Sequence, residues 1–425
     1  MPRMDTITTR LKQAIDAKRD LAIALQRDLT AIPALAPQSD GTGEKEKAHK
    51  LVEWLAKLGL PEPLGVPSPD PRVPGGKRPN LVVTIPGKVK DRTFWIMSHL
   101  DIVPPGERKL WTSDPYALVV DGDRLVGRGV EDNQQGLVAS VLAAAALRGL
   151  GLEPACTVRL LFVADEETGS EHGVQHVLAA APHLFTAADC ALVPDHGAPD
   201  GSEIEIAEKS ILWLKFTTKG RQCHASTPQK GVNAFAAGSL LVVRLGDLAR
   251  IYPASDPLFD PPVSTFTPTK KEANVPNVNT LPGEDVFYLD SRILPSIDLD
   301  GVMARIRSIA DGVEKECGVT VSIEIVQRAS SPATPEDAPI VQGLKRAVTE
   351  VYGVKARTMG IGGGTVGAFL RHRGIATVVW SRLEGKAHQP DESCRMSNLL
   401  GDSLVMASLM LDSEAAEGLG TPRTN

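Results

Sequence analysis

The strongest constraint on the fold is an alternation of strand-like and helix-like segments over residues 1–208 of the 425-residue chain. Short runs rich in Val, Ile and aromatic residues have the length of strands, at 80–85, 93–98, 157–164 and 189–193. Helical spacing of apolar residues appears between them, most clearly at 135–149. Because parallel strands need helical crossovers, this order predicts an α/β fold with a mostly parallel sheet and helices on both faces.

The alternation is interrupted after Lys209, where a different order of elements begins. The patterns then follow as strand, helix, strand, strand, helix and strand, at 211–218, 233–251, 263–267, 285–294, 298–316 and 319–327. A Ser-, Pro- and Ala-rich stretch near Ser330 is typical of a linker, and helix–strand alternation resumes after it. We therefore expect one α/β domain formed by 1–208 and 330–425, interrupted by a smaller α+β (βαββαβ) domain at 209–329.

Composition restricts the partners and the compartment. The formal net charge of −6 gives no general attraction to nucleic acid or to anionic membranes, so neither is expected as a partner. No apolar segment is long enough to span a bilayer, and the charged first residues leave no room for a signal peptide. The five cysteines are scattered without metal-binding spacing, which favours reduced thiols. These features predict a cytoplasmic protein.

Three of the predicted strands run directly into acidic residues or histidines, at His99-Leu100-Asp101, Asp165-Glu166-Glu167 and Pro194-Asp195-His196. A further acidic pair, Glu131-Asp132, lies in a loop just ahead of a helix. Ligand sites in open α/β sheets lie outside the carboxyl ends of the strands, so we expect these loops to converge. Carboxylates at this density repel one another unless cations neutralise them. Histidine and carboxylates without clustered thiols suit zinc, cobalt or manganese.

These segments resemble the successive motifs of one family of zinc-dependent amidohydrolases and exopeptidases. The family includes carboxypeptidase G, acetylornithine deacetylase and succinyl-diaminopimelate desuccinylase. Its motifs occur here in the family's order, at His99-Leu100-Asp101, Gly127-Arg128-Gly129 with Asp132, Asp165-Glu166-Glu167-Thr168-Gly169-Ser170, Asp195 and Ala387-His388-Gln389-Pro390-Asp391-Glu392. The resemblance implies that 1–208 and 330–425 form a catalytic domain and that 209–329 form a lid and dimerisation domain, so a homodimer is expected.

The resemblance also implies a ligand set for two metal ions. Asp132 would be the carboxylate that bridges them. His99 and Asp195 would complete one site, and Glu167 and His388 the other. Zinc is the expected metal, with cobalt or manganese as alternatives.

Two further residues would act beside the metals. Asp101 would hydrogen-bond the far nitrogen of His99 and fix its tautomer. Glu166 would be the general base that takes a proton from a metal-activated water. The implied reaction is hydrolysis of the amide bond of an N-acyl amino acid, a small substrate with a free carboxylate. A dipeptidase or carboxypeptidase with the same metals is the nearest alternative, and a non-catalytic binding protein on the same fold is the other.

Five residues are expected to contact the substrate. His224 resembles a lid histidine that helps hold the carbonyl oxygen and, in dimeric members, comes from the partner subunit. Asn279 and Arg292 match a substrate-contacting Asn and a carboxylate-binding Arg, whose guanidinium suits bidentate recognition. Gly363 and Gly364 would form a tight turn that faces the substrate.

Two departures from the family pattern bear on substrate identity. The chain has Asn133-Gln134-Gln135-Gly136 where relatives usually place a Lys before the glycines. Val366 stands where many relatives have Asp. We expect both positions at the rim of the substrate pocket.

Overall fold

The computed structural model of the chain describes residues 2–415, so that residues 416–425 at the end of the expected catalytic domain lie outside the described part. The described residues form two compact units. The first comprises 2–206, 334–358 and 369–415, and the second comprises 207–333 and 359–368.

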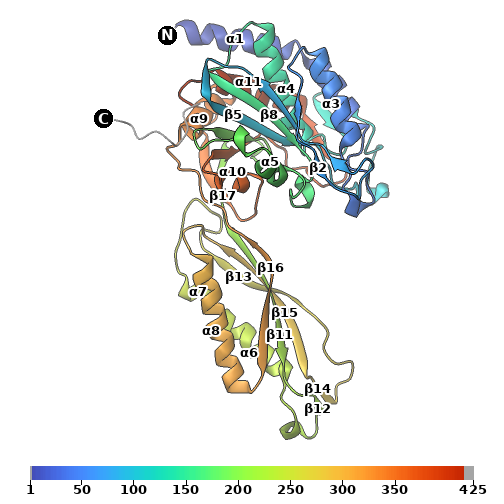
Figure 1. Ribbon diagram of the computed structural model, residues 1–425, viewed down its shortest axis with the longest axis vertical. Helices are drawn as coiled ribbons and strands as arrows, with labels where there is room; N and C mark the ends of the chain where they lie inside the picture. Colours follow the sequence, from blue (N-terminus) through green and yellow to red (C-terminus); the bar gives the residue numbers. More distant parts are fainter. Residues whose placement is uncertain (1, 416–425) are drawn as a thin grey trace, which may run out of the picture. The chain divides into compact units, whose positions relative to one another are not determined.

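An eight-stranded sheet forms the centre of the first unit, in the order β1-β4-β8-β5-β9-β18-β10-β17. Figure 1 labels its neighbouring strands β5 and β8. The strands of the sheet are β1 (Leu64–Gly65), β4 (Leu81–Ile85), β5 (Val89–His99), β8 (Cys156–Val163), β9 (Cys190–Val193), β10 (Glu203–Glu208), β17 (Arg357–Ile361) and β18 (Ala376–Val379). The neighbours β8, β5, β9 and β18 pair in parallel, whereas β4 and β10 pair antiparallel. The predicted parallel sheet is therefore confirmed at its centre, with antiparallel strands toward the edges.

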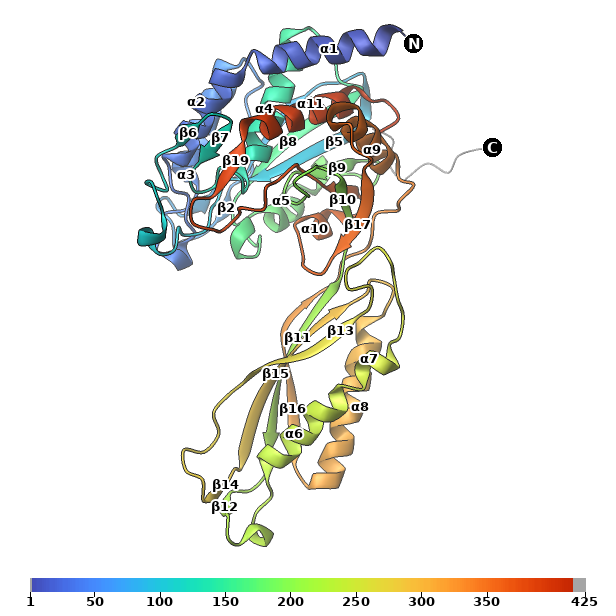
Figure 2. The ribbon, with the colours of Figure 1, turned by 180° about the vertical axis from the view of Figure 1, so that it is seen from behind.

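Helices cover both faces of this sheet (Figures 1 and 2). They are α1 (Pro2–Asp16), α2 (Arg19–Thr30), α3 (Lys45–Lys57), α4 (Gln134–Gly149), α5 (Val174–Ala180), α9 (Pro339–Tyr352), α10 (Gly367–Arg371) and α11 (Met396–Leu411). Helix α4 leads from β5 to β8, and α5 leads back from β8 past β5 to β9. Because such crossovers are right-handed, the two opposite directions place α4 and α5 on opposite faces. Helix α4 is alanine-rich and buried over almost its whole length, with α1, α2 and α11 packed against it.

Smaller elements complete the first unit. A three-stranded sheet of β19 (Ser393–Arg395), β7 (Arg124–Val126) and β6 (Val119–Asp121) joins two segments that are far apart in the sequence. Strands β2 (Ser68–Pro69) and β3 (Lys77–Arg78) form a separate pair. The short 3-10 helices of the chain are η1 (Pro37–Ser39), η2 (Arg108–Leu110), η3 (Glu166–Thr168), η4 (Pro182–Leu184) and η5 (Pro228–Lys230).

The second unit has the predicted βαββαβ order. It consists of β11 (Ser210–Lys219), α6 (Ala234–Leu245), α7 (Leu248–Ile251), β13 (Thr265–Lys271), β15 (Glu284–Ile293), α8 (Leu299–Cys317) and β16 (Thr320–Ala329), with the short pair β12 (Cys223–His224) and β14 (Thr280–Leu281). The four long strands pair antiparallel in the order β13-β15-β11-β16. The helix expected over 233–251 is divided at Gly246 into α6 and α7.

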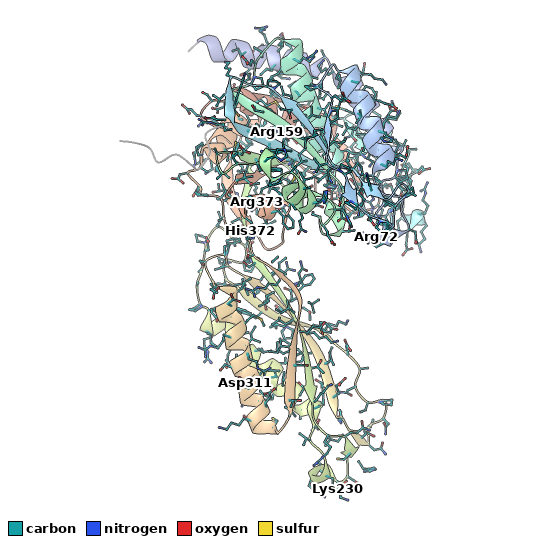
Figure 3. The ribbon with its side chains drawn as sticks, viewed as in Figure 1. Arg72, Arg159, Lys230, Asp311, His372 and Arg373 are labelled. Carbon is teal, nitrogen blue, oxygen red and sulfur yellow. The ribbon has the colours of Figure 1, made fainter. Side chains whose placement is uncertain are left out.

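Helices α6 and α8 pack against this sheet and close a separate core, in which Phe216 and Phe287 stack with ring centroids 4.7 Å apart. The exposed Asp311 marks the outer side of α8, and Lys230 lies at the end of the unit that carries β12 and β14 (Figure 3). Asp298 caps the start of α8 by accepting the N–H of Gly301, and Gly318 ends it in a left-handed conformation. Across residues 2–415, no helix combines the length and the apolar character needed to cross a membrane.

Candidate metal centre

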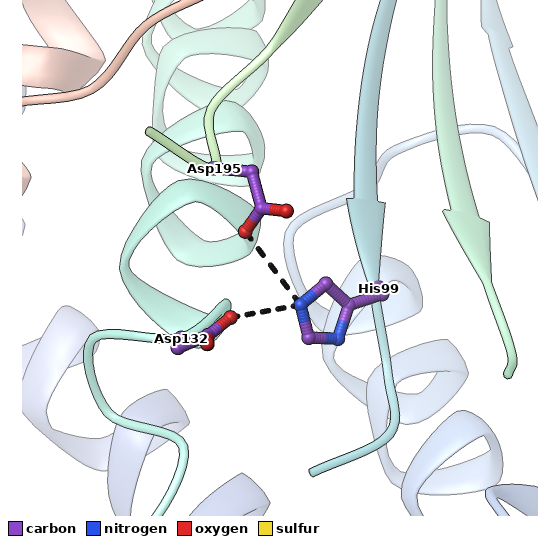
Figure 4. Close-up of side chains that lie close together, drawn as sticks. All are labelled: His99, Asp132 and Asp195. Carbon is purple, nitrogen blue, oxygen red and sulfur yellow. Dashed lines mark hydrogen bonds and ion pairs between the residues drawn. The ribbon is translucent and has the colours of Figure 1, made fainter. Parts of the chain in front are cut away.

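His99, Asp132 and Asp195 form one group of ligand atoms in the first unit (Figure 4). His99 is the last residue of β5, Asp195 follows β9, and Asp132 lies just ahead of α4. The Nε2 atom of His99 is 2.9 Å from Oδ1 of Asp132 and 3.7 Å from Oδ1 of Asp195. The carboxyl ends of β5 and β9 meet at one edge of the sheet, which is why these side chains converge.

Asp132, Glu167 and His388 form a second group. The Nε2 atom of His388 is 3.1 Å from Oδ2 of Asp132 and 3.1 Å from Oε2 of Glu167. Glu167 lies in η3, which follows β8, and His388 lies in the loop ahead of β19. Asp132 therefore directs one carboxylate oxygen to each group.

Opposite charges dominate the electrostatics of both groups. Burial alone would lower the pKa of His99, but the three aspartates around it, Asp101, Asp132 and Asp195, raise it well above its ordinary value. Hydrogen bonds to Asp132 and Glu167 raise the pKa of His388 to about 10. Burial opposes the charge of Asp132, yet hydrogen bonds from the two histidines lower its pKa. The carboxylates thus stabilise positive charge at both imidazoles, and imidazole with carboxylate is a donor set that fits zinc, cobalt or manganese.

Asp101 supports the turn that carries the two glutamates. Its carboxylate accepts the backbone N–H of Glu166 at 3.1 Å and that of Glu167 at 3.0 Å. The Nδ1 atom of His99 lies 3.0 Å from the carbonyl oxygen of Asp101 and 3.5 Å from its carboxylate. The partner at hydrogen-bond distance is therefore the carbonyl rather than the carboxylate that we expected. Since a carbonyl accepts but cannot donate, Nδ1 donates to it, and Nε2 faces Asp132 and Asp195.

Glu166 stands apart from both groups of ligand atoms. Its side chain makes no hydrogen bond within residues 2–415, whereas Glu167 contacts His388. Burial, followed by the negative charge of Asp195, raises the pKa of Glu166 well above its ordinary value. Burial raises the pKa of Glu167 as well, so the two adjacent glutamates differ in their partners rather than in the direction of the pKa shift.

A buried ion network lies behind this turn. Arg78 is fully buried, forms a short contact with Glu44, and donates to Oδ1 of Asp165 at 2.6 Å. Asp165 immediately precedes Glu166 and has a left-handed backbone with φ of 64°. Lys47 is also buried, and burial lowers its pKa to about 8 against the opposing charges of Asp101 and Glu44. Sequence patterns did not identify these supporting residues, because a single Arg or Lys in a loop or helix is usually exposed.

The segment after Asp132 does not lie at a pocket rim, contrary to our expectation. Asn133, Gln134 and Gln135 are all buried. The side-chain amide of Asn133 donates to Oδ1 of Asp195 at 2.6 Å, and that of Gln135 donates to Asp402 at 2.8 Å. These amides hold neighbouring parts of the first unit together, which explains why uncharged residues occupy these positions. Val366 is buried as well.

The expected substrate-binding residues lie in the second unit. His224 is exposed on β12, and Ala225, which follows it, donates its N–H to the carbonyl of Asn279 at 2.9 Å. The Nε and Nη2 atoms of Arg292 donate to both carboxylate oxygens of Asp290, at 2.8 and 3.1 Å. Its Nη1 atom donates to the carbonyl of Gly362 at 2.9 Å, and its guanidinium lies 5.5 Å from the ring centroid of Trp213.

Gly363 and Gly364 follow this carbonyl in the segment 359–368. A Cβ atom added at Gly363 would meet no heavy atom within 4 Å, and one at Gly364 would be in ordinary contact with Glu208 and Ile211. Neither glycine has a positive φ. The turn therefore has no steric need for glycine in the second unit itself.

Comparison with known proteins places the chain among metal-dependent hydrolases. A profile of Peptidase family M20/M25/M40 matches residues 95–412. An uncharacterized metallohydrolase of Methanocaldococcus jannaschii is 36% identical over 394 residues, which cover 89% of this chain and 96% of that protein. A succinyl-diaminopimelate desuccinylase of Dinoroseobacter shibae is 28% identical over 381 residues, which cover 89% and 95% of the two chains.

Solved structures share the fold. The aminopeptidase PepT from Bacillus cereus has a TM-score of 0.73 at 19% identity, with 94% of this chain and 99% of that chain covered. A Bacillus subtilis protein described as a dinuclear metal binding peptidase has a TM-score of 0.67 at 18% identity, with coverage of 93% and 98%. At these identities the similarity establishes the fold alone.

Proposed function

Because this chain belongs to Peptidase family M20/M25/M40 and is a metal-dependent hydrolase, we propose that it cleaves the amide bond of an N-acyl amino acid. The observation that carries the proposal is the position of Asp132, whose two carboxylate oxygens face separate groups of histidine and carboxylate. The similarity to a desuccinylase favours a deacylase over a dipeptidase or carboxypeptidase. In this proposal the first unit is the catalytic domain and the second is the lid.

The two groups of ligand atoms would each hold one divalent cation, with zinc as the first choice. When bound, the cations would activate a water molecule and polarise the scissile carbonyl. Glu166 would accept the proton of the attacking water on its carboxylate and pass it to the nitrogen of the leaving amine. Asp101 keeps Glu166 in place through the backbone N–H, so the Glu166 carboxylate stays free for proton transfer.

Arg292 is our candidate for recognition of the substrate carboxylate. Its side chain is 27% exposed, and Trp213 supports the guanidinium. Because Asp290 already pairs with the guanidinium fork, a substrate carboxylate would have to share or replace that partner. We therefore expect a smaller contribution from Arg292 than from a fully buried and unpaired arginine.

The test compares Arg292→Ala with the native enzyme on a panel of N-acetyl amino acids, N-succinyl amino acids and dipeptides. We expect kcat/KM for the preferred N-acyl substrate to fall about ten- to a hundredfold in the variant. The same substrate with its carboxylate amidated should react slowly with both proteins and to the same extent. Arg244→Ala, which removes another ion-paired and partly exposed arginine of the second unit, away from β16, is the matched control and should leave kcat/KM unchanged. An equal fall in kcat/KM on the two substrates would refute carboxylate recognition by Arg292. A preference of the native enzyme for dipeptides would show that it is a dipeptidase rather than a deacylase.

We also propose a homodimer formed through the second unit. Strand β16 is an edge of its sheet, and Ile325 and Val326 on it are about half exposed. An open edge of this kind is stabilised when a second strand pairs with it. The Nδ1 atom of His224 accepts from Ser226, which leaves Nε2 directed away from that contact.

Mixing two inactive variants tests this dimer. His224→Ala and Glu166→Gln are expected to be inactive alone and to regain part of the native activity after subunit exchange. Recovery follows because a mixed dimer would contain one active site with both residues intact. If mass spectrometry shows that mixed dimers have formed and no activity returns, His224 does not act across a subunit boundary.

A further inference from the structure

Two buried glutamates outside the ligand set connect the segments that carry Asp132 and His388. The carboxylate of Glu392 is 1% exposed and receives four hydrogen bonds from the segment that ends at Asp132. The donors are Nη1 of Arg128 at 2.6 Å and the backbone N–H groups of Gly129 at 3.1 Å, Glu131 at 3.0 Å and Asp132 at 3.1 Å. The backbone that presents Asp132 is thus held by a carboxylate 260 positions away in the sequence.

Glu131 makes the reciprocal connection. The residue is also 1% exposed. Its carboxylate accepts the backbone N–H groups of Glu384 at 2.5 Å and of Ala387 at 2.9 Å, and makes a short hydrogen bond with that of Lys386. These three residues lie within the four positions before His388. Each carboxylate therefore belongs to one ligand-bearing segment and holds the other. We call this arrangement of Glu131 and Glu392 the glutamate clasp.

The two groups of ligand atoms differ in how much they need such a clasp. His99 and Asp195 are placed by β5 and β9, which pair in parallel within the central sheet. His388 lies in a loop with φ of 63°, and its side chain is 53% exposed. Neither sheet pairing nor deep burial holds His388, whereas Glu131 holds the backbone just ahead of it through three hydrogen bonds.

We propose that Glu131 and Glu392 are positioning residues that fix His388 and Asp132 relative to each other and thereby form the second cation site. This inference rests on the proposed two-cation function. The Glu131 side chain acts on the second site, because the hydrogen bonds to its carboxylate come only from the segment before His388. Glu392 holds Asp132, which faces both sites, so its loss affects both.

The test measures zinc stoichiometry and affinity by equilibrium dialysis and mass spectrometry of the intact protein. Glu131→Gln replaces one acceptor oxygen by a donor, which faces N–H groups and cannot accept from them. We expect one zinc ion to bind with native affinity and the other to bind about ten- to a hundredfold more weakly. Glu131→Asp, which keeps two acceptor oxygens on a shorter side chain, should have an intermediate affinity for the second ion.

Asp189→Asn is the matched control for loss of a buried carboxylate. Asp189 is equally buried in the same unit and accepts the N–H of Thr93 and the indole N–H of Trp95, both at 2.9 Å. We expect this variant to lose thermal stability while it keeps both zinc affinities. If Glu131→Gln does not fold, Glu131→Asp is used instead to compare the affinities of the two zinc ions. Native affinity for both ions in the Glu131 variants would refute the proposed role of the glutamate clasp. Equal weakening of both ions in those variants, or a similar loss of zinc affinity in Asp189→Asn, would refute it as well. A native protein that binds fewer than two ions at saturation would instead refute the proposed function.

Discussion

Replacement of Glu166 by glutamine is expected to reduce turnover by about two to four orders of magnitude while zinc content stays native. The side chain of Glu166 belongs to neither group of ligand atoms, and an amide cannot take the proton of the attacking water. The turn should keep its position, because Asp101 binds the backbone N–H groups and not the carboxylate of Glu166. Steady-state kinetics on the preferred substrate and metal analysis of the same preparation provide the two measurements.

Glu167→Gln is the control for this substitution, since it makes the same chemical change at the next residue of the turn. The carboxylate of Glu167 contacts His388 in the second group, so this variant should lose one zinc ion as well as activity. Loss of zinc from Glu166→Gln together with retention of zinc by Glu167→Gln would show that Glu166 is the ligand and Glu167 the base. Near-native turnover in Glu166→Gln would remove the general base from the proposed mechanism.

Substitution of Asp132 by alanine should abolish binding of both zinc ions and with it the stabilisation that zinc provides. One oxygen of this carboxylate faces His99 and the other faces His388, and no other residue of 2–415 belongs to both groups. A cation present at a thousand times its Kd stabilises the folded state by about 4 kcal/mol. Zinc should therefore raise the Tm of the native protein by several degrees and leave that of Asp132→Ala unchanged.

Asp195→Ala provides the comparison for this result, because Asp195 belongs to the first group only. It should keep one zinc ion and part of the zinc-dependent rise in Tm. An Asp132→Ala protein that binds two zinc ions and responds to them like the native protein would show that the bridge lies elsewhere. The metal-free forms of the three proteins should be compared first, so that loss of the ion pairs of Asp132 is measured separately.

The order of elements could be read from the sequence because it depends on local patterns. Strand β9, most of β8 and the buried second half of β5 are largely apolar runs, and the buried helix α4 is an alanine-rich segment. The division of 233–251 at Gly246 was missed, since apolar spacing continues on both sides of that glycine. The βαββαβ order of the second unit was predicted correctly for the same local reason.

The convergence of the loops that carry His99, Glu167 and Asp195 could also be predicted from the sequence, because the carboxyl ends of neighbouring parallel strands meet at one edge. The place of His388 among the candidate ligands came from the family resemblance. The hydrogen-bond partners of the ligands could not be predicted. The hydrogen bond from His99 goes to the carbonyl of Asp101, a choice that side-chain identity does not reveal. Asn133 was expected at a pocket rim, yet its amide is buried against Asp195. The sequence does not distinguish a glutamine or asparagine that contacts substrate from one that forms a buried hydrogen bond within the protein.

Sequence alone determined which chemical groups are present and which strand end or loop carries each one, since strand length, helical spacing and motif order are local properties of the chain. Only the tertiary structure decided that Asp132 faces two groups and that Glu131 and Glu392 hold each other's segments. Those contacts join backbone N–H groups to carboxylates more than 250 positions away, as between Glu131 and Glu384. Every residue except proline carries a backbone N–H, so its sequence position contains no signal for such a contact. The pairing of β7 with β19 brings the two segments together, so that these hydrogen bonds can form.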